Sequence, residues 1–249
     1  MNPIKARGRA RGHDLLLLYI YCVFTAKALP LHIENHCPMK SQEIYPELRE
    51  YIEKKILPLY RNFDKAHRCE HAATVIEESL RLATHYNVDT NMVYAIAAFH
   101  DTGLCEGRET HHTASARIVK SDAFLKTLFT DEQIGIIADA VEDHRASSKQ
   151  PPRTIYGKIV AEADRLIDGE TIMRRTIQYG LAHYPEKSRE QHFERACQHL
   201  EEKYGHKGYL RLWIPQSPNA VRLQQFREII DNKPLLLALF NRLFDEECR

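Results

Sequence analysis

The sequence lacks the cysteine spacing of a disulfide framework or a zinc knuckle. Its six cysteines, spread over 249 residues, form no CxxC pair and recur at no regular interval. Both classes of protein place cysteines at short, repeated spacings, so the pattern argues against both. We therefore expect these cysteines to be mostly reduced thiols.

The sequence also lacks an excess of charge of either sign. Lysine and arginine together number 35, and aspartate and glutamate number 34, which gives a formal net charge of +1. Proteins that bind nucleic acid or anionic membranes through a charged surface carry a strong basic excess. We therefore expect no nucleic-acid polymer and no membrane surface as the main partner.

No apolar run is long enough to span a bilayer as a helix, which takes about 20 residues. The candidate run, LLLLYIYCVF over residues 15–24, follows four basic residues and precedes small ones. This layout fits a secretory signal within residues 1–28, which would export the protein, or an extension upstream of the true start. We favour the extension, expect a cytoplasmic protein with no membrane span, and leave residues 1–38 out of the fold prediction.

No segment shows the sustained alternation of polar and apolar residues that predicts strands. Apolar residues recur instead at helical spacing from Ser41 onward. Pro58 is expected to end the first helix, Asp89 or Thr90 to cap the third, and Thr130 with Gln133 to form a capping box. The predicted helices cover about residues 41–57, 64–86, 90–101, 114–129, 131–145, 153–168, 170–184, 188–204 and 234–249. A further helix is predicted to begin at Pro218, with Ser217 as its cap.

The most informative residues are the adjacent His100 and Asp101. They end an almost wholly apolar run from Met92 to Phe99, which predicts a buried helix. A buried charge is strongly disfavoured unless it is paired or bound to a metal. Because imidazole and carboxylate together suit a divalent transition metal or a similar cation, the pair predicts a metal site.

Two other predicted helices can supply ligands to the same site. His71 lies in the helix that begins near Asp64, and Asp164 lies in an apolar helical stretch, KIVAEADRL. Metal sites in helical bundles are built from inward side chains on facing helices. The sequence therefore predicts a site that gathers His71, His100, Asp101 and Asp164.

The order of these four residues resembles the H…HD…D signature of HD-domain metal-dependent phosphohydrolases. The HDTG segment after the apolar helix and the Ala-Asp-Arg-Leu segment around Asp164 also match, and the resemblance covers roughly residues 60–170. It implies an all-α, HD-domain-like helical bundle in which the four residues bind one metal. We expect this metal-binding domain over residues 39–180 and a helical extension, packed on the same core, over residues 181–249.

Three further histidines bear on the number of metals. His111 stands in the family position four residues before a serine, with His112 next to it, and His144 resembles the histidine of a following helix. Family members with both extra histidines can hold two metals bridged by the HD aspartate, which is Asp101 here. The family often has an acidic residue where this chain has His112, so the choice between His111 and His112 stays open.

The resemblance implies hydrolysis of a small phosphate ester or nucleotide by water activated on one or two divalent ions, such as Mn, Mg, Fe, Co, Ni or Zn. Besides Asp101, we expect Arg68 and Arg145 to act in catalysis, because charge developing on phosphoryl oxygens calls for cations. Arg68 precedes His71 by nearly one helical turn, and Arg145 directly follows His144. Other cationic residues near the site in sequence are Lys65, Arg108 and Arg165.

Two other functions compete with hydrolysis. A di-iron oxygenase can use the same scaffold if two irons are held with His144 and one of the paired histidines. A non-catalytic signalling or binding module would be favoured by a missing ligand, and none is missing here. The C-terminal aromatic residues either pack against the core or wall the substrate pocket; they are Tyr184, Phe193, Tyr204, Tyr209 and Trp213.

Overall fold

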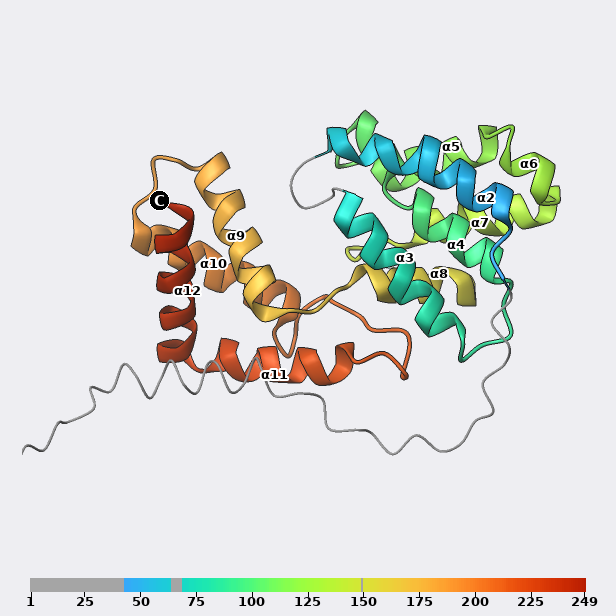
Figure 1. The fold of residues 1–249 in the computed structure, drawn as a ribbon. Coiled ribbons are helices and arrows are strands. Elements are labelled where there is room, and N and C mark those ends of the chain that lie inside the picture. The colour runs from blue at the N-terminus through green and yellow to red at the C-terminus, as the bar shows by residue number, and fades with distance from the viewer. Residues whose placement is uncertain (1–42, 64–68, 149) are drawn as a thin grey trace, which may run out of the picture. The chain divides into compact units, whose positions relative to one another are not determined.

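The structure is a computed structural model that describes residues 43–63, 69–148 and 150–249 (Figure 1). All regular secondary structure in these ranges is helical, which confirms the predicted all-α class. The contacts divide the described chain into an N-terminal unit, which runs to Ile167 and also includes Tyr209–Arg222, and a C-terminal unit, Asp168–Gly208 with Leu223–Arg249. The predicted boundaries at residues 38 and 180 stay predictions, and residues 1–38 lie outside the described ranges.

The N-terminal unit is built around helix α4, Thr90–Phe99, in which every residue is buried. Helices α3 (Cys69–Ala83), α7 (Asp131–Asp143) and α8 (Ile155–Asp164) pack against α4, and α5 (His111–Ser121) packs against α7. A helix that is apolar all round must be covered by its neighbours. These neighbours bury α4 up to its C-terminal end, where His100 and Asp101 follow.

The first helical segment passes through Pro58, where the sequence predicted an end. Helix α2 (Pro46–Tyr51) continues as a π-helix, Ile52–Ile56, and then as a 3₁₀-helix, Leu57–Asn62. Proline has no N–H to donate, and the change of hydrogen-bonding pattern accommodates it within the first turn of the 3₁₀-helix. The helix thus changes type just before the proline, near the predicted end at Pro58, and the chain continues as a 3₁₀-helix to Asn62.

The segment predicted as one helix over residues 114–129 forms two helices. Helix α5 ends at Ser121, and the short helix α6 covers Leu125–Leu128. Asp122 lies between them: its Oδ1 accepts a hydrogen bond from the backbone N–H of Leu125 at 2.8 Å, and its Oδ2 accepts one from the hydroxyl of Tyr51 at 2.6 Å. An aspartate side chain that accepts a hydrogen bond from the backbone N–H three residues later favours a turn and so interrupts the preceding helix.

Two predicted caps are present as hydrogen bonds. Asp89, one of the two candidates for the start of α4, accepts a hydrogen bond from the backbone N–H of Asn91 at 2.8 Å. Thr130 and Gln133 form the reciprocal capping box of α7. These caps fix where α4 and α7 begin and so contribute to where each helix ends, which matters because both ends carry site residues.

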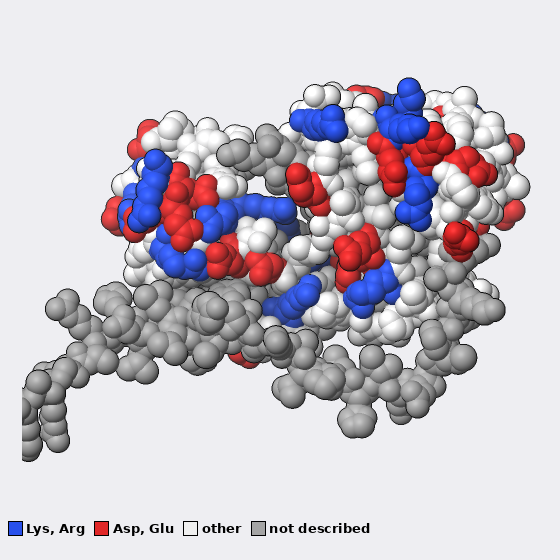
Figure 2. Space-filling model, viewed as in Figure 1, with Lys and Arg blue, Asp and Glu red and all other residues white. Residues whose placement is uncertain are grey.

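The C-terminal unit packs helix α9 (Gly169–His183) against α10 (Arg189–Tyr204) and α12 (Lys233–Glu247). Helix α11, Asn219–Asp231, begins in the N-terminal unit and ends in this one. Arg174 pairs with Glu246 at 2.6 Å, and Arg242 pairs with Glu170 at 2.7 Å, which links α9 to α12. Basic and acidic side chains are interspersed on the face shown in Figure 2.

Residues 209–222 return to the N-terminal unit and are held there by a buried carboxylate on α8. Glu162 is fully buried, and its Oε2 accepts hydrogen bonds from the backbone N–H groups of Trp213 and Ile214 at 2.6 and 3.4 Å. Its Oε1 accepts one from the side-chain amide of Asn219 at 3.0 Å. Glu162 therefore attaches this distant segment to the helix that carries Asp164.

Among the residues that the structure describes, no helix has both the length and the apolar character needed to cross a membrane.

We predict that Glu162→Gln lowers the free energy of unfolding by about 2 kcal/mol, because an amide nitrogen would face an N–H donor inside the protein. The measurement is chemical denaturation followed by circular dichroism. Glu77→Gln, on an exposed position of α3, is the matched control and should leave stability nearly unchanged. Equal stability of Glu162→Gln and the wild type would contradict the anchoring role of Glu162.

Candidate metal centre

The centre begins at the C-terminal end of α4, where His100 is the capping residue and is fully buried. Its ring Nδ1 lies 2.7 Å from the carbonyl oxygen of Ala97, one turn earlier. The buried hydroxyl of Tyr60 donates to the carbonyl of Ala98 at 3.0 Å and accepts from the backbone N–H of Asp101 at 3.3 Å. These contacts fix the backbone at the point where the two site residues leave the helix.

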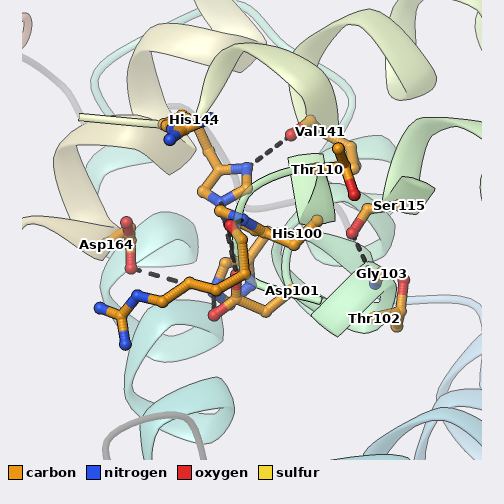
Figure 3. Close-up of polar contacts among 12 residues, drawn as sticks. His100, Asp101, Thr102, Gly103, Thr110, Ser115, Val141, His144 and Asp164 are labelled. Carbon is orange, nitrogen blue, oxygen red and sulfur yellow. Dashed lines mark hydrogen bonds and ion pairs between the residues drawn. The ribbon is translucent and has the colours of Figure 1, made fainter. Parts of the chain in front are cut away.

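One group of ligand atoms gathers around Oδ2 of Asp101. His100 Nε2 lies 3.2 Å from this oxygen, and His71 Nε2 lies 3.8 Å from it. The two ring nitrogens are 3.3 Å apart, and Oδ1 of Asp164 is 3.2 Å from His71 Nε2. The four residues predicted from the H…HD…D order therefore meet at one place. Figure 3 labels three of them, His100, Asp101 and Asp164.

A second group gathers around the other oxygen of the same carboxylate. His111 Nε2 and His144 Nε2 lie 3.5 and 3.4 Å from Oδ1 of Asp101, and 3.1 Å from each other. His111 comes from the first turn of α5, and His144 caps the C-terminal end of α7. Asp101 therefore offers one oxygen to each group, the arrangement expected of a residue that bridges two cations.

The imidazole rings of three histidines are oriented by the same device. In each, Nδ1 faces a backbone carbonyl three residues earlier, and a carbonyl can only accept a hydrogen bond, so Nδ1 carries the proton. The pairs are His100 with Ala97 at 2.7 Å, His111 with Arg108 at 2.7 Å and His144 with Val141 at 2.6 Å. In the neutral ring Nε2 then carries a lone pair that is directed at the site, which is the orientation that metal-binding histidines require.

The Nε2 lone pairs of His111 and His144 point at each other. His111 Nε2 and His144 Nε2 are 3.1 Å apart, and when both rings are neutral neither has a proton to share there. Either an added proton or a cation must lie in this region. Ligand atoms about 2.1 Å from one cation lie roughly 3.0–3.4 Å apart in octahedral or tetrahedral geometry. The spacing of the ring nitrogens fits that requirement.

The charged groups of the site strongly affect one another's pKa values. Burial acts to raise the pKa of Asp101, but His100 and His144 hold it well below its usual range. Burial also opposes the charged form of His100, yet the carboxylates of Asp101 and Asp164 raise its pKa to about 9. For His111, burial and the neighbouring His144 lower the pKa to about 4. The carboxylates are thus ionised, and without a cation the site keeps a proton on His100 near neutral pH.

Gly103 sets the distance between the loop after Asp101 and the start of α5. A Cβ atom at this position would lie 2.2 Å from the carbonyl oxygen of His111 and 2.5 Å from the backbone nitrogen of Ser115. The N–H of Gly103 donates to the hydroxyl of Ser115 at 2.8 Å, as drawn in Figure 3. Any side chain here would push α5, and with it His111, away from Asp101.

The structure selects between the two neighbouring histidines. His111 joins the group around Asp101, whereas His112 belongs to neither group of potential ligands. Burial, Arg145 and His144 lower the pKa of His112, and its Nδ1 is buried with no hydrogen-bond partner. Of the two histidines named in the prediction, the structure thus brings His111 to Asp101, and the roles of both in metal binding stay predictions.

The structure says less about the arginine and lysine side chains that the sequence analysis named near the site. Arg145 donates from NH1 to the carbonyl of Glu109 at 2.7 Å and from Nε to the hydroxyl of Ser147 at 2.9 Å, so it holds the loop that leads into His111. Arg108 is exposed in that loop. Arg68 and Lys65 lie outside the residues that the structure describes. Catalytic roles for Arg68 and Arg145 stay predictions.

Sequence reasoning missed three supporting residues, Tyr60, Gly103 and Glu162. Tyr60 and Glu162 act through contacts with residues 38 and more positions away, so no local pattern reveals them. A signal for Gly103 existed: it directly follows the His-Asp-Thr segment, and a serine stands twelve residues later. A tight approach of the chain at that glycine was one reading of the pattern.

The comparison with protein families agrees with this geometry. Residues 68–168 match the family model described as HD domain. The matched range contains His71, His100, Asp101, His111, His144 and Asp164, and the structure places helices beyond it. The chain therefore carries an HD domain over residues 68–168. The curated proteins and the solved structures that were searched gave no match.

We predict that Asp101→Ala abolishes binding of divalent metal, because each group of ligands loses its shared carboxylate oxygen. His144→Ala should bind about one equivalent of metal, half the content of the wild type, since the group around Oδ2 stays intact. Metal content after dialysis, measured by inductively coupled plasma mass spectrometry, tests both. The control is Asp231→Ala, which removes an exposed aspartate 3.2 Å from His206. A full complement of metal in Asp101→Ala would rule out the assignment.

Proposed function

We propose that the HD domain of this protein is a metal-dependent phosphohydrolase that cleaves a small phosphate ester or nucleotide. The observation that carries the proposal is the two groups of ligand atoms that share the carboxylate of Asp101. Hydrolysis of a phosphate ester needs a polarised phosphoryl oxygen and an activated water close together. Two adjacent cation sites on one carboxylate supply both.

In this proposal His71, His100, Asp101 and Asp164 hold one divalent cation, and Asp101, His111 and His144 hold a second. Bound cations lower the pKa of water and polarise phosphoryl oxygens. The chain keeps the histidines correctly oriented by their carbonyl contacts and keeps the carboxylates ionised by the surrounding imidazoles. The side chain of His100 is fully buried, and those of Asp101 and His144 are 4% and 3% exposed, so these three form the floor of the site.

Substrate approaches from the opposite side of the ligand groups. The side chains of Asp164, His111 and His71 are 21%, 13% and 9% exposed, respectively, so the rim of the site is more open than its floor. We place the phosphoryl group at this rim. Arg145 follows His144 and supports the loop before His111. We assign its positively charged side chain to the rim, where it would face the phosphoryl group.

Oxygenase chemistry is the second candidate, because a carboxylate that faces two groups of histidines also suits two irons. A non-catalytic binding module is the third. The three functions differ in what is consumed: an ester and water, an organic substrate and dioxygen, or nothing. Assays for each product therefore separate them.

We predict release of inorganic phosphate from at least one member of a panel of nucleotides and small phosphate esters. Activity should require added Mn²⁺, Mg²⁺, Co²⁺ or Ni²⁺, stop when a chelator is added, and fall by roughly a thousandfold or more in Asp101→Ala. No phosphorylated enzyme should accumulate, because the attacking group is water and not a side chain. Phosphate release and intact-mass measurement test these points.

Measurements on the same protein preparation separate hydrolysis from the other two functions. Metal-loaded protein that releases no phosphate from any ester would contradict the hydrolase assignment. Consumption of dioxygen by the iron-loaded protein would then favour the oxygenase. Absence of both, with ligand binding retained, would favour the binding module.

We also predict that cation binding at pH 7.5 releases about one proton, because Nε2 of His100 must give up its proton to accept a metal. The sign follows from the raised pKa of about 9 for His100: the metal-free site holds the extra proton below that pH, so affinity rises as pH increases toward 9. Calorimetric titration with Mn²⁺ in buffers of different ionisation enthalpy measures the released proton. Heats that are independent of the buffer would contradict this prediction.

A further inference from the structure

A buried arginine lies directly beside the metal centre. Arg165 follows Asp164 at the end of α8, and its guanidinium carbon lies 6.0 Å from the centroid of the Trp213 ring. Trp213 belongs to residues 209–222, which are part of the same compact unit. A segment far along the chain thus covers the residue next to a proposed metal ligand.

Within the part of the chain that the structure describes, Arg165 forms no ion pair within bonding distance, although the carboxylates of Asp164 and Glu162 attract its charge. It is 7% exposed, its NH1 group donates to the carbonyl of Ala161, and its Nε–H is buried without a hydrogen-bond partner. No ion pair joins it to a carboxylate among the described residues. A buried guanidinium is costly unless an anion or several acceptors satisfy it, so this arrangement needs an explanation.

The two nearest carboxylates in sequence are already used. Asp164 directs Oδ1 to His71 at 3.2 Å, and in the proposed function it also binds a cation. Glu162 uses both oxygens to hold the returning segment, at Trp213 and Asn219. Burial lowers the pKa of the Arg165 guanidinium, and the two carboxylates partly offset this effect, but neither of them forms an ion pair with it.

A second donor next to Arg165 is also unsatisfied. The indole Nε1–H of Trp213 is buried and has no hydrogen-bond partner. Two adjacent groups that can only donate call for a ligand that can only accept. A phosphate group meets that requirement with several oxygens, and arginine binds it with two parallel hydrogen bonds.

We propose that Arg165 and Trp213 bind a phosphate group of the substrate beside the metal centre. The proposal rests on the proposed function for the location of the substrate, and it adds residues outside the ligand set. To bind, the guanidinium turns away from the carbonyl of Ala161 and directs its N–H groups to phosphate oxygens. Glu162 keeps Trp213 in place, so residues 209–222 complete the substrate site.

The test measures binding of inorganic phosphate to the full-length, Mn²⁺-loaded protein by isothermal calorimetry. Arg165→Gln should weaken binding at least about tenfold, and Arg165→Lys less, because lysine keeps the charge but loses the fork of donors. Trp213→Phe keeps an aromatic ring over the guanidinium and removes the N–H, so it should weaken binding by about three- to tenfold. Arg211→Gln removes an exposed arginine from the same segment and should bind phosphate like the wild type.

Three outcomes would overturn the subsite: wild-type protein that binds no phosphate, affinity unchanged in both Arg165→Gln and Trp213→Phe, or acetate binding as tight as phosphate binding. Manganese content and circular dichroism are measured for every variant. If Arg165→Gln misfolds or loses metal, Arg165→Lys and Trp213→Phe decide the question. Phosphate binding that depends on Arg165, in a protein that hydrolyses no ester, would refute the proposed function and keep the subsite.

Discussion

The centre depends on three hydrogen bonds from imidazole Nδ1 atoms to backbone carbonyls one turn earlier. They set the tautomer of His100, His111 and His144 and direct each Nε2 at Asp101. Two of the three histidines cap the helices that end beside the site, so folding of α4 and α7 itself orients the ligands. The cost of gathering imidazoles and carboxylates in a buried place is met when a cation binds among them.

The strongest sequence signals were those with a local cause. The apolar run before His100 can only be a buried helix, and the capping residues Asp89 and Thr130 mark where two helices begin because their side chains bond to nearby N–H groups. The break at Asp122 was missed, although aspartate is a common cap, because its second partner is Tyr51, 71 residues earlier. Local reasoning could not choose between His111 and His112, since the choice depends on how α5 meets the loop at Gly103.

The return of residues 209–222 to the N-terminal unit could not be predicted for the same reason. Glu162 gives no sign in sequence that it binds the backbone of Trp213 and Ile214, about 50 residues later. Yet this contact places an aromatic ring over Arg165, next to Asp164. The HD domain of residues 68–168 is thus supplemented by a segment outside the matched range. In our proposals, Asp164 at the end of α8 holds a cation, and Arg165, the residue that follows it, binds the charge of the substrate.

Anomalous X-ray diffraction from crystals grown with Mn²⁺, recorded on both sides of the manganese absorption edge, tests directly whether Asp101 lies between two cations. We expect two anomalous peaks, one on each side of the Asp101 carboxylate, with Nε2 of the histidines as ligands. A single peak among His71, His100, Asp101 and Asp164 would reduce the centre to one metal. Diffraction from metal-saturated protein with no peak at Asp101 would rule out a metal centre at this carboxylate.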